Sequence, residues 1–136
     1  MSNITFECQK SVYAAMMANT TLTTLVSSRI YDEPPGNCSY PYVLIGGGGT
    51  TPHLRHEYDG INNSFLITIY TNPGSLGFYP SEQIAEEIKN CLHLKKLTIS
   101  DANFKNIITI EESMDRERDG MYRNIDLRYK MIIEKQ

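Results

Sequence analysis

The sequence predicts an α+β fold, in which an antiparallel sheet of about four or five strands carries two helices packed on one face. Three observations predict this class. Apolar residues recur with helical spacing in two stretches, they alternate with polar residues in others, and turn residues separate these stretches. Helices and strands are clustered instead of strictly alternating, which favours antiparallel pairing over parallel βαβ units.

The N-terminal helix is expected over residues 4–18. Its buried stripe comprises Cys8, Val12, Ala15 and Met16. A short second helical turn is expected within 19–28, packed on the first helix. Asn19 or Thr20 is its expected cap, because a short oxygen-bearing side chain accepts a hydrogen bond from the free amides of a first turn.

The second long helix is expected over 81–94, directly after Pro80, because a proline near a helix start loses no needed hydrogen bond. Its apolar stripe comprises Ile84, Ile88, Cys91 and Leu92. We expect this stripe to face the side of the sheet that carries Ile125, Leu127 and Tyr129.

Strands account for most of the remaining chain. Prolines predict a loop over 29–42, and "YVLI" at 42–45 predicts a buried strand. Another strand is expected within 53–60, and a clearer one over 63–71, where β-branched and aromatic residues dominate. Phe65, Ile67 and Ile69 share one face of that strand.

The C-terminal part predicts a long hairpin with strands at 104–114 and 123–134. The second strand alternates apolar and polar residues, as an antiparallel strand with one wet face does. The segment "RERDGMY" is expected to join the strands, with Asp119-Gly120 as the turn dipeptide, because both residue types tolerate positive φ.

Length and composition restrict the class of protein. The 136 residues predict a single domain over 1–136 of ordinary globular composition. A net charge of −3 gives no basic excess, so we expect no specific nucleic-acid binding. Three cysteines without CxxC spacing indicate neither a disulfide framework nor a zinc site. No signal peptide and no membrane-spanning segment is expected.

Four consecutive glycines, Gly46, Gly47, Gly48 and Gly49, raise the question of a phosphate-binding loop. A Walker loop needs a lysine and a following helix, and neither is present, while the G-x-G-x-x-G pattern also fails. No nucleotide and no other cofactor is therefore expected. We interpret the segment as a flexible connection between two strands that becomes ordered against a partner.

Histidines supply the only candidate catalytic group. His53, His56 and Glu57 could bind a metal, but on a strand their spacing puts the two imidazoles on opposite faces. His93 stands alone and is expected at the surface. No nucleophile motif is present, so the sequence predicts no enzyme, and a small metal-dependent enzyme remains the alternative.

Charges of both signs alternate near the predicted C-terminal turn, at Arg116, Glu117 and Arg118. Such a run is either a solvated turn or an arm that reaches a neighbouring subunit. Both interpretations stay open at this point.

Several stretches in this order resemble the small tail-completion proteins of long-tailed bacteriophages, prophages and gene transfer agents, also called tail terminators or head-to-tail joining proteins. The similarity covers about residues 6–134. It is carried by "QKSVYAAMMANTTLTTLVSSRIYDEPP", "YPYVLIGGG", "FLITIYTNPG", "CLHL" and "IITIEESMDRERDGMYRNIDLRYKMIIE". The glycines after "PYVLI" and the segment 98–106 depart from the family pattern.

The resemblance implies a structural virion protein and no catalysis. Family members form a ring, commonly six-fold, that caps the head-proximal end of the tail tube, ends tube growth and joins the tail to the head connector. Expected partners are other copies of the chain, the tail tube protein and a head connector or completion protein. Assembly would occur in the bacterial cytoplasm, without a membrane. A head-completion or neck role in the same particle is an alternative.

A closed head-to-tail ring needs two different patches on each subunit. The segments expected to project from the sheet are the candidates for these patches. The expected interface residues are Gly46, Gly47, Gly48, Gly49, His53, Arg55, Arg116, Glu117 and Arg118.

Overall fold

A computed structural model describes residues 4–33, 36, 38–54, 59–72, 77–99, 104–120 and 122–135. Three helices and five strands occur in this part of the chain. In chain order they are α1 (Ile4–Met17), α2 (Thr20–Val26), β1 (Ile30–Tyr31), β2 (Tyr42–Leu54), β3 (Asp59–Thr71), α3 (Tyr79–Leu92), β4 (Phe104–Asp119) and β5 (Tyr122–Lys135).

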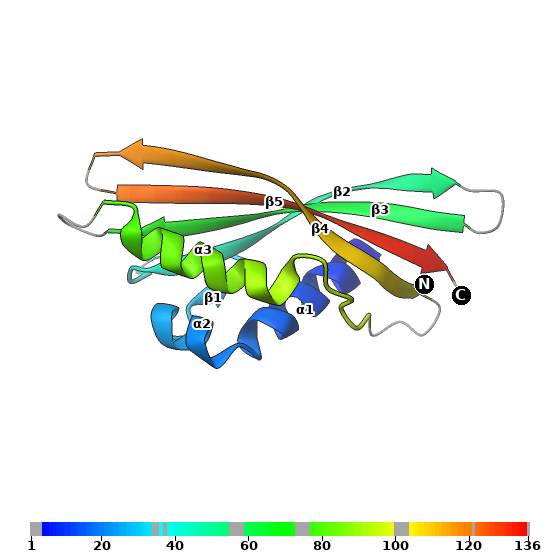
Figure 1. The fold of residues 1–136 in the computed structure, drawn as a ribbon, viewed down its shortest axis with the longest axis horizontal. Coiled ribbons are helices and arrows are strands. Elements are labelled where there is room, and N and C mark those ends of the chain that lie inside the picture. The colour runs from blue at the N-terminus through cyan, green and yellow to red at the C-terminus, as the bar shows by residue number, and fades with distance from the viewer. Residues whose placement is uncertain are drawn as a thin grey trace.

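The strands form one twisted sheet in the order β1-β2-β3-β5-β4. Every neighbouring pair is antiparallel except β1 and β2, which are parallel. All three helices lie against the same face of the sheet (Figure 1). The predicted α+β class is confirmed, including the short helix expected within 19–28, and one parallel pair is added to the expected antiparallel sheet.

Alternation along the strands decides which face the helices cover. In the register of β3 with β5, Ile67 lies opposite Leu127 and Ile69 opposite Ile125, and all four side chains are buried. The residues between them on each strand point to the other face, since side chains alternate along a strand. The expected apolar face of Phe65, Ile67 and Ile69 is therefore confirmed.

The helices bury the predicted stripes against this face. Ile84, Ile88 and Leu92 of α3 lie in the same core cluster as the apolar residues of β5. Asn19 caps α2 as expected, because its side-chain oxygen accepts a hydrogen bond from the Leu22 amide at 3.1 Å. From α1, the core includes Cys8, Val12 and Met16.

One part of the expected loop at 29–42 is a strand. Ile30 pairs with Val43, and Tyr31 with Leu44, at the edge of the sheet. The Arg29 side chain holds this segment in place, because its Nε donates to the Pro41 carbonyl at 2.9 Å and its Nη2 to the Tyr40 carbonyl at 3.0 Å. A strand of two residues, followed by prolines, has too short an apolar pattern to be predicted.

The glycine stretch is also a strand and not a loop. Strand β2 continues through it to Leu54, with Gly46 opposite Leu66 and Gly47 opposite Phe65. The register shifts between Gly47 and Thr50, which marks a bulge or irregularity. Glycine has a low intrinsic preference for strands, but pairing with the long neighbouring strand β3 supplies the backbone hydrogen bonds that hold this stretch extended.

The C-terminal hairpin is longer than predicted. Strand β4 continues to Asp119 and β5 begins at Tyr122, so Arg116, Glu117 and Arg118 belong to the strand and not to the connecting turn. Gly120 has a φ of 60°, as expected of a turn residue, but Asp119 is the last residue of β4 and pairs with Tyr122, so the turn begins one residue later than predicted.

Ile88 is fully buried between α3 and the sheet, so the Ile88→Ala variant should lose about 2–5 kcal/mol of unfolding free energy. Urea denaturation followed by circular dichroism measures this loss. The exposed Asn90→Ala change on the same helix is the control and should alter stability little. A loss below about 0.5 kcal/mol for Ile88→Ala would contradict the assigned helix face.

Candidate functional site

Of the predicted interface residues, the glycines 46–49 lie in the middle of β2, whereas His53 and the residues 116–118 lie near opposite ends of the sheet. The β2–β3 hairpin closes where Leu54 pairs with Asp59, near Glu134 of β5. The β4–β5 hairpin closes at the other end, where Asp119 pairs with Tyr122 (Figure 1). The structure therefore does not bring the two predicted segments together within one chain.

The β2–β3 hairpin end projects past the helices, whereas the start of α3 lies beside the β4–β5 hairpin, where the Arg123 guanidinium carbon is 5.6 Å from the centroid of the Phe78 ring (Figure 1). A strand of 13 residues, such as β3, spans roughly 43 Å, whereas the 14 residues of α3 span about 21 Å. The hairpin end of β2 carries the backbone of His53, and the glycines lie farther back, in the middle of the strand. Arg55, His56 and Glu57 lie outside the described residues, as does the side chain of His53.

Arg116 is bound within its own subunit. Its register partner is Ile125, which places it on the helix-covered face. There its Nη2 forms an ion pair with Glu82 Oε1 of α3, and its guanidinium carbon lies 5.7 Å from the centroid of the Phe78 ring. Arg116 therefore connects β4 to the start of α3. No pattern in the sequence indicated this contact within the subunit, since Arg116 was expected only at an interface between subunits.

Glu117 and Arg118 are exposed on opposite faces of the same strand. Glu117 pairs with Asn124, and Arg118 lies opposite Arg123. The Arg123 side chain is itself occupied, since its Nη1 donates to the Gly120 and Tyr122 carbonyls at 2.8 and 2.9 Å. Within the described ranges no salt bridge involves Glu117 or Arg118. These two charges remain available to a partner.

Tyrosines gather at this end of the sheet, and sequence analysis missed them. We call the group of Tyr31, Tyr40, Tyr42, Tyr70 and Tyr122 the tyrosine cluster. Tyr42 stacks on Tyr70 with ring centroids 4.8 Å apart, and Tyr40 lies 5.1 Å from Tyr122. The signal was present in "YPY" at 40–42 and in the alternation of Tyr42 and Tyr70 with buried neighbours.

Carboxylates surround the tyrosine cluster on the face that carries no helices. Asp115 lies directly opposite Asp126 in the β4–β5 register, and Thr68 Oγ1 donates to Asp126 Oδ1 at 2.9 Å. Burial raises the pKa of Tyr70, and the negative charges of Asp126 and Glu117 raise it further by smaller amounts. Burial also raises the pKa of Tyr42 to about 12, with smaller contributions from Tyr40 and Cys38.

The free edge of β4 is partly covered by the segment after α3. Leu94 N donates to Thr109 O at 2.7 Å, and Thr109 N donates to Lys95 O at 2.8 Å. His93 accepts a hydrogen bond from the Glu111 amide at its Nδ1, at 3.2 Å. The expectation of a solitary surface histidine is thus wrong, because His93 caps an edge amide of β4 and is half-buried.

Buried Asn106 holds this covering segment in position. Its Oδ1 accepts hydrogen bonds from Leu97 N at 2.8 Å and from Thr109 Oγ1 at 3.0 Å. Its Nδ2 donates to the carbonyls of Ile108 and Ile132 at 2.9 and 3.0 Å. A strand from another molecule therefore cannot add to β4 at Thr109 and Glu111, since their amides are already used.

In the described part of the chain, no three His, Cys, Asp or Glu side chains are grouped so that they could hold a metal ion. Burial, with a smaller contribution from the negative charge of Glu7, raises the pKa of Cys8 to about 12. The Cys8 thiol therefore stays protonated at neutral pH. None of the described helices combines the length and apolar character needed to cross a membrane.

The Arg116–Glu82 pair is exposed enough to contribute little stability, so Arg116→Ala should lower the unfolding free energy by less than about 1 kcal/mol. A double-mutant cycle with Glu82→Gln, measured by urea denaturation, isolates the pair. Its coupling should be about 0.2–1 kcal/mol. A coupling of zero would show that the two side chains do not interact in solution.

Tyr42 makes stability sensitive to alkaline pH. Its pKa rises from about 10 in the unfolded chain to about 12 in the folded one. The neutral phenol therefore favours the folded state below pH of about 10, and this contribution disappears as pH rises through about 12. Denaturation across this window should show a smaller alkaline loss for Tyr42→Phe than for the wild type. Equal losses would contradict the raised pKa.

Comparisons with known proteins agree with the fold. The family model described as tail completion protein gp17 matches residues 10–134. A chain in the solved virion of a native gene transfer agent particle superposes with a TM-score of 0.81, at 24% identity over 93% of each chain. A second solved structure gives a TM-score of 0.55, at 11% identity over 94% of this chain and 95% of its own.

No match was found among curated protein sequences. At identities below 25%, the two solved structures establish the fold alone. The family model establishes more, because it matches nearly the whole chain, from the middle of α1 to the end of β5. The chain belongs to the tail completion protein gp17 family, whose members are structural proteins of phage tails.

Proposed function

We propose that the chain forms a ring that caps the head-proximal end of the tail tube, ends tube growth and joins the tail to the head connector. The observation that carries this proposal is membership of the tail completion family over residues 10–134. The virion particle in which a chain of similar fold occurs is consistent with this role. The ring has six copies, as the resemblance to this family implies.

The shape of the subunit supports a ring. Heterologous contacts, in which one patch meets a different patch on the next copy, close into rings. The sheet offers different surfaces at its two edges, since β1 ends one side and β4 the other. It also offers different hairpins at its two ends (Figure 1). The sheet edges suit contacts between copies, and the two hairpin ends suit contacts with proteins above and below the ring.

The β4–β5 hairpin has the better chemistry for such an axial contact. Exposed Glu117 and Arg118 have no partner of opposite charge among the described residues, and the tyrosine cluster lies at the same end. Tyrosines supply large contact areas at low entropic cost, and rim charges set orientation. At the other end, the β2–β3 hairpin, where Leu54 pairs with Asp59, is the surface left for the second axial contact. We propose that one of these two ends contacts the tail tube and the other contacts the head connector.

Deletion of the gene should yield tails of uncontrolled length that fail to join heads, because nothing would cap the growing tube. Complementation with Arg118→Glu should give a folded protein, because a carboxylate opposite Arg123 replaces a like-charge pair with an opposite-charge pair. It should not restore the joining of tails to heads, because the charge that the hairpin presents at position 118 is reversed. Electron microscopy measures tail length and the fraction of joined particles.

The exposed α3 change Glu86→Lys is the control for charge reversal and should complement fully. Normal joined tails without the gene would contradict the proposed function itself. Normal tails with Arg118→Glu would contradict only the role of the hairpin. Tails of normal length that lack heads in the deletion strain would indicate a neck role instead of tube termination.

A further inference from the structure

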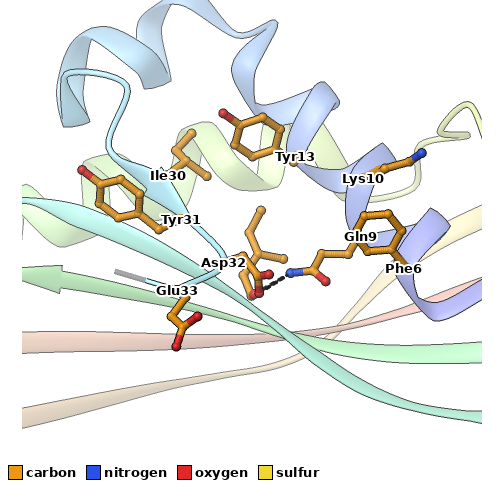
Figure 2. A pocket seen from close by; sticks show the side chains of 9 residues that line it. Phe6, Gln9, Lys10, Tyr13, Ile30, Tyr31, Asp32 and Glu33 are labelled. Carbon is orange, nitrogen blue, oxygen red and sulfur yellow. Dashed lines mark hydrogen bonds between the residues drawn. The ribbon is translucent and has the colours of Figure 1, made fainter. Parts of the chain in front are cut away.

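A groove of about 630 Å³ lies between α1 and the edge strand β1. Buried Ile30 and Ile45 contribute to its floor, and Phe6 and Tyr13 of α1 form a wall (Figure 2). Phe6 and Tyr13 are 52% and 43% exposed. The groove is thus apolar, open and situated at one edge of the sheet.

The β1 side of this groove carries negative charge. Asp32 and Glu33 follow the strand directly and line the opening (Figure 2). Gln9 Nε2 donates to Asp32 Oδ1 at 2.7 Å, which orients this carboxylate without neutralising it. Lys10, the cation nearest along α1, forms a salt bridge with Glu7 at 3.3 Å. Over the described ranges no salt bridge involves Asp32 or Glu33.

A complementary projection lies beside the opposite edge of the sheet. Leu94 is 59% exposed and has a φ of 58°, a left-handed conformation that leucine rarely adopts. Lys95 and Lys96 follow it and are also exposed. In the described part of the chain neither lysine forms a salt bridge. An apolar side chain is therefore held outward, next to two unpaired positive charges.

The backbone of this projection is held by hydrogen bonds within its own subunit. Hydrogen bonds to Thr109 fix the backbone of Leu94 and Lys95, and Asn106 fixes Leu97. Residues held in sparsely populated backbone conformations persist only where the surroundings over-determine them, and they cluster at functional sites. A pre-organised projection loses little entropy on binding, which favours a specific contact.

We propose that Leu94 of one copy inserts into the α1–β1 groove of the next copy, with Lys95 and Lys96 facing Asp32 and Glu33. This inference rests on the proposed ring and names the contact that closes it. The occupant is a second copy because the groove and projection complement each other in charge and apolar character. They belong to opposite edges of one sheet, β1 and β4. Such a contact is heterologous and can repeat around a ring.

Leu94→Gly is the sharpest variant for this contact. Glycine adopts positive φ without penalty, so the monomer should keep or raise its thermal midpoint while it loses the inserted side chain. Ring-capped tails, counted by electron microscopy after complementation, should fall at least tenfold. Tyr79→Ser removes an equally exposed apolar side chain from α3 and should leave the count unchanged. Unchanged capping with a folded Leu94→Gly protein would overturn the proposal.

A charge exchange tests the pairing across the contact. Glu33→Lys and Lys96→Glu should each reduce capping several-fold, and the chain that carries both should recover most of it, because each contact regains opposite charges. Glu86→Lys should have no effect. Defects that add in the double variant, without recovery, would overturn the assigned charge pairing.

Cross-linking tests the contact directly. A chain with both Tyr13→Cys and Leu94→Cys, assembled into tails and treated with a short bismaleimide, should give a ladder of multiples up to the full ring. Either single variant, and the native chain with its own three cysteines, should give none of the ladder. Cross-links from position 13 to another protein, or no ladder from rings seen by microscopy, would overturn the contact. Absence of the wild-type chain from rings would overturn the proposed function as well.

Discussion

Burial of a single face of the sheet is the constraint on which the rest of the structure depends. Strands β3 and β5 alternate buried and half-exposed residues in register, so a slip by one residue would expose Ile67 and Leu127 together. The helices cover this face and nothing else. The surfaces left for contacts with other proteins are consequently the uncovered face, the two edges, the two hairpin ends and the outer sides of the helices.

These remaining surfaces differ in what they allow. The β4 edge is blocked at Thr109 and Glu111 by the backbone of Lys95 and the ring of His93. The β1 edge is only two residues long. The covered part of β4 and the short β1 are therefore poorly suited to a continuous sheet across subunits, which would also favour uncontrolled aggregation. Side-chain contacts between copies fit the fold better, because they allow a defined number of copies.

Sequence periodicity predicted the fold well where one face is buried. The α3 stripe and the alternation of β5 were correct because burial imposes a strong pattern on Ile88 and Leu127. Sequence periodicity failed where pairing with a neighbouring strand, and not burial of side chains, decides the conformation. The glycines of β2 and the strand at Ile30 are examples. Of the candidate site, Glu117 and Arg118 are exposed as expected, whereas Arg116 is bound to Glu82. The tyrosine cluster joins residues far apart in sequence, which no local pattern reveals.

The placement of the two hairpins at opposite ends of the sheet has a consequence for polarity (Figure 1). One end presents tyrosines together with Glu117 and Arg118, which have no salt-bridge partner among the described residues, and the other presents the β2–β3 hairpin. A cyclic array has no two-fold axis relating its upper and lower surfaces. With the strands along the ring axis, every copy would point the same way, so the assembly would be a directional adaptor between two chemically different neighbours.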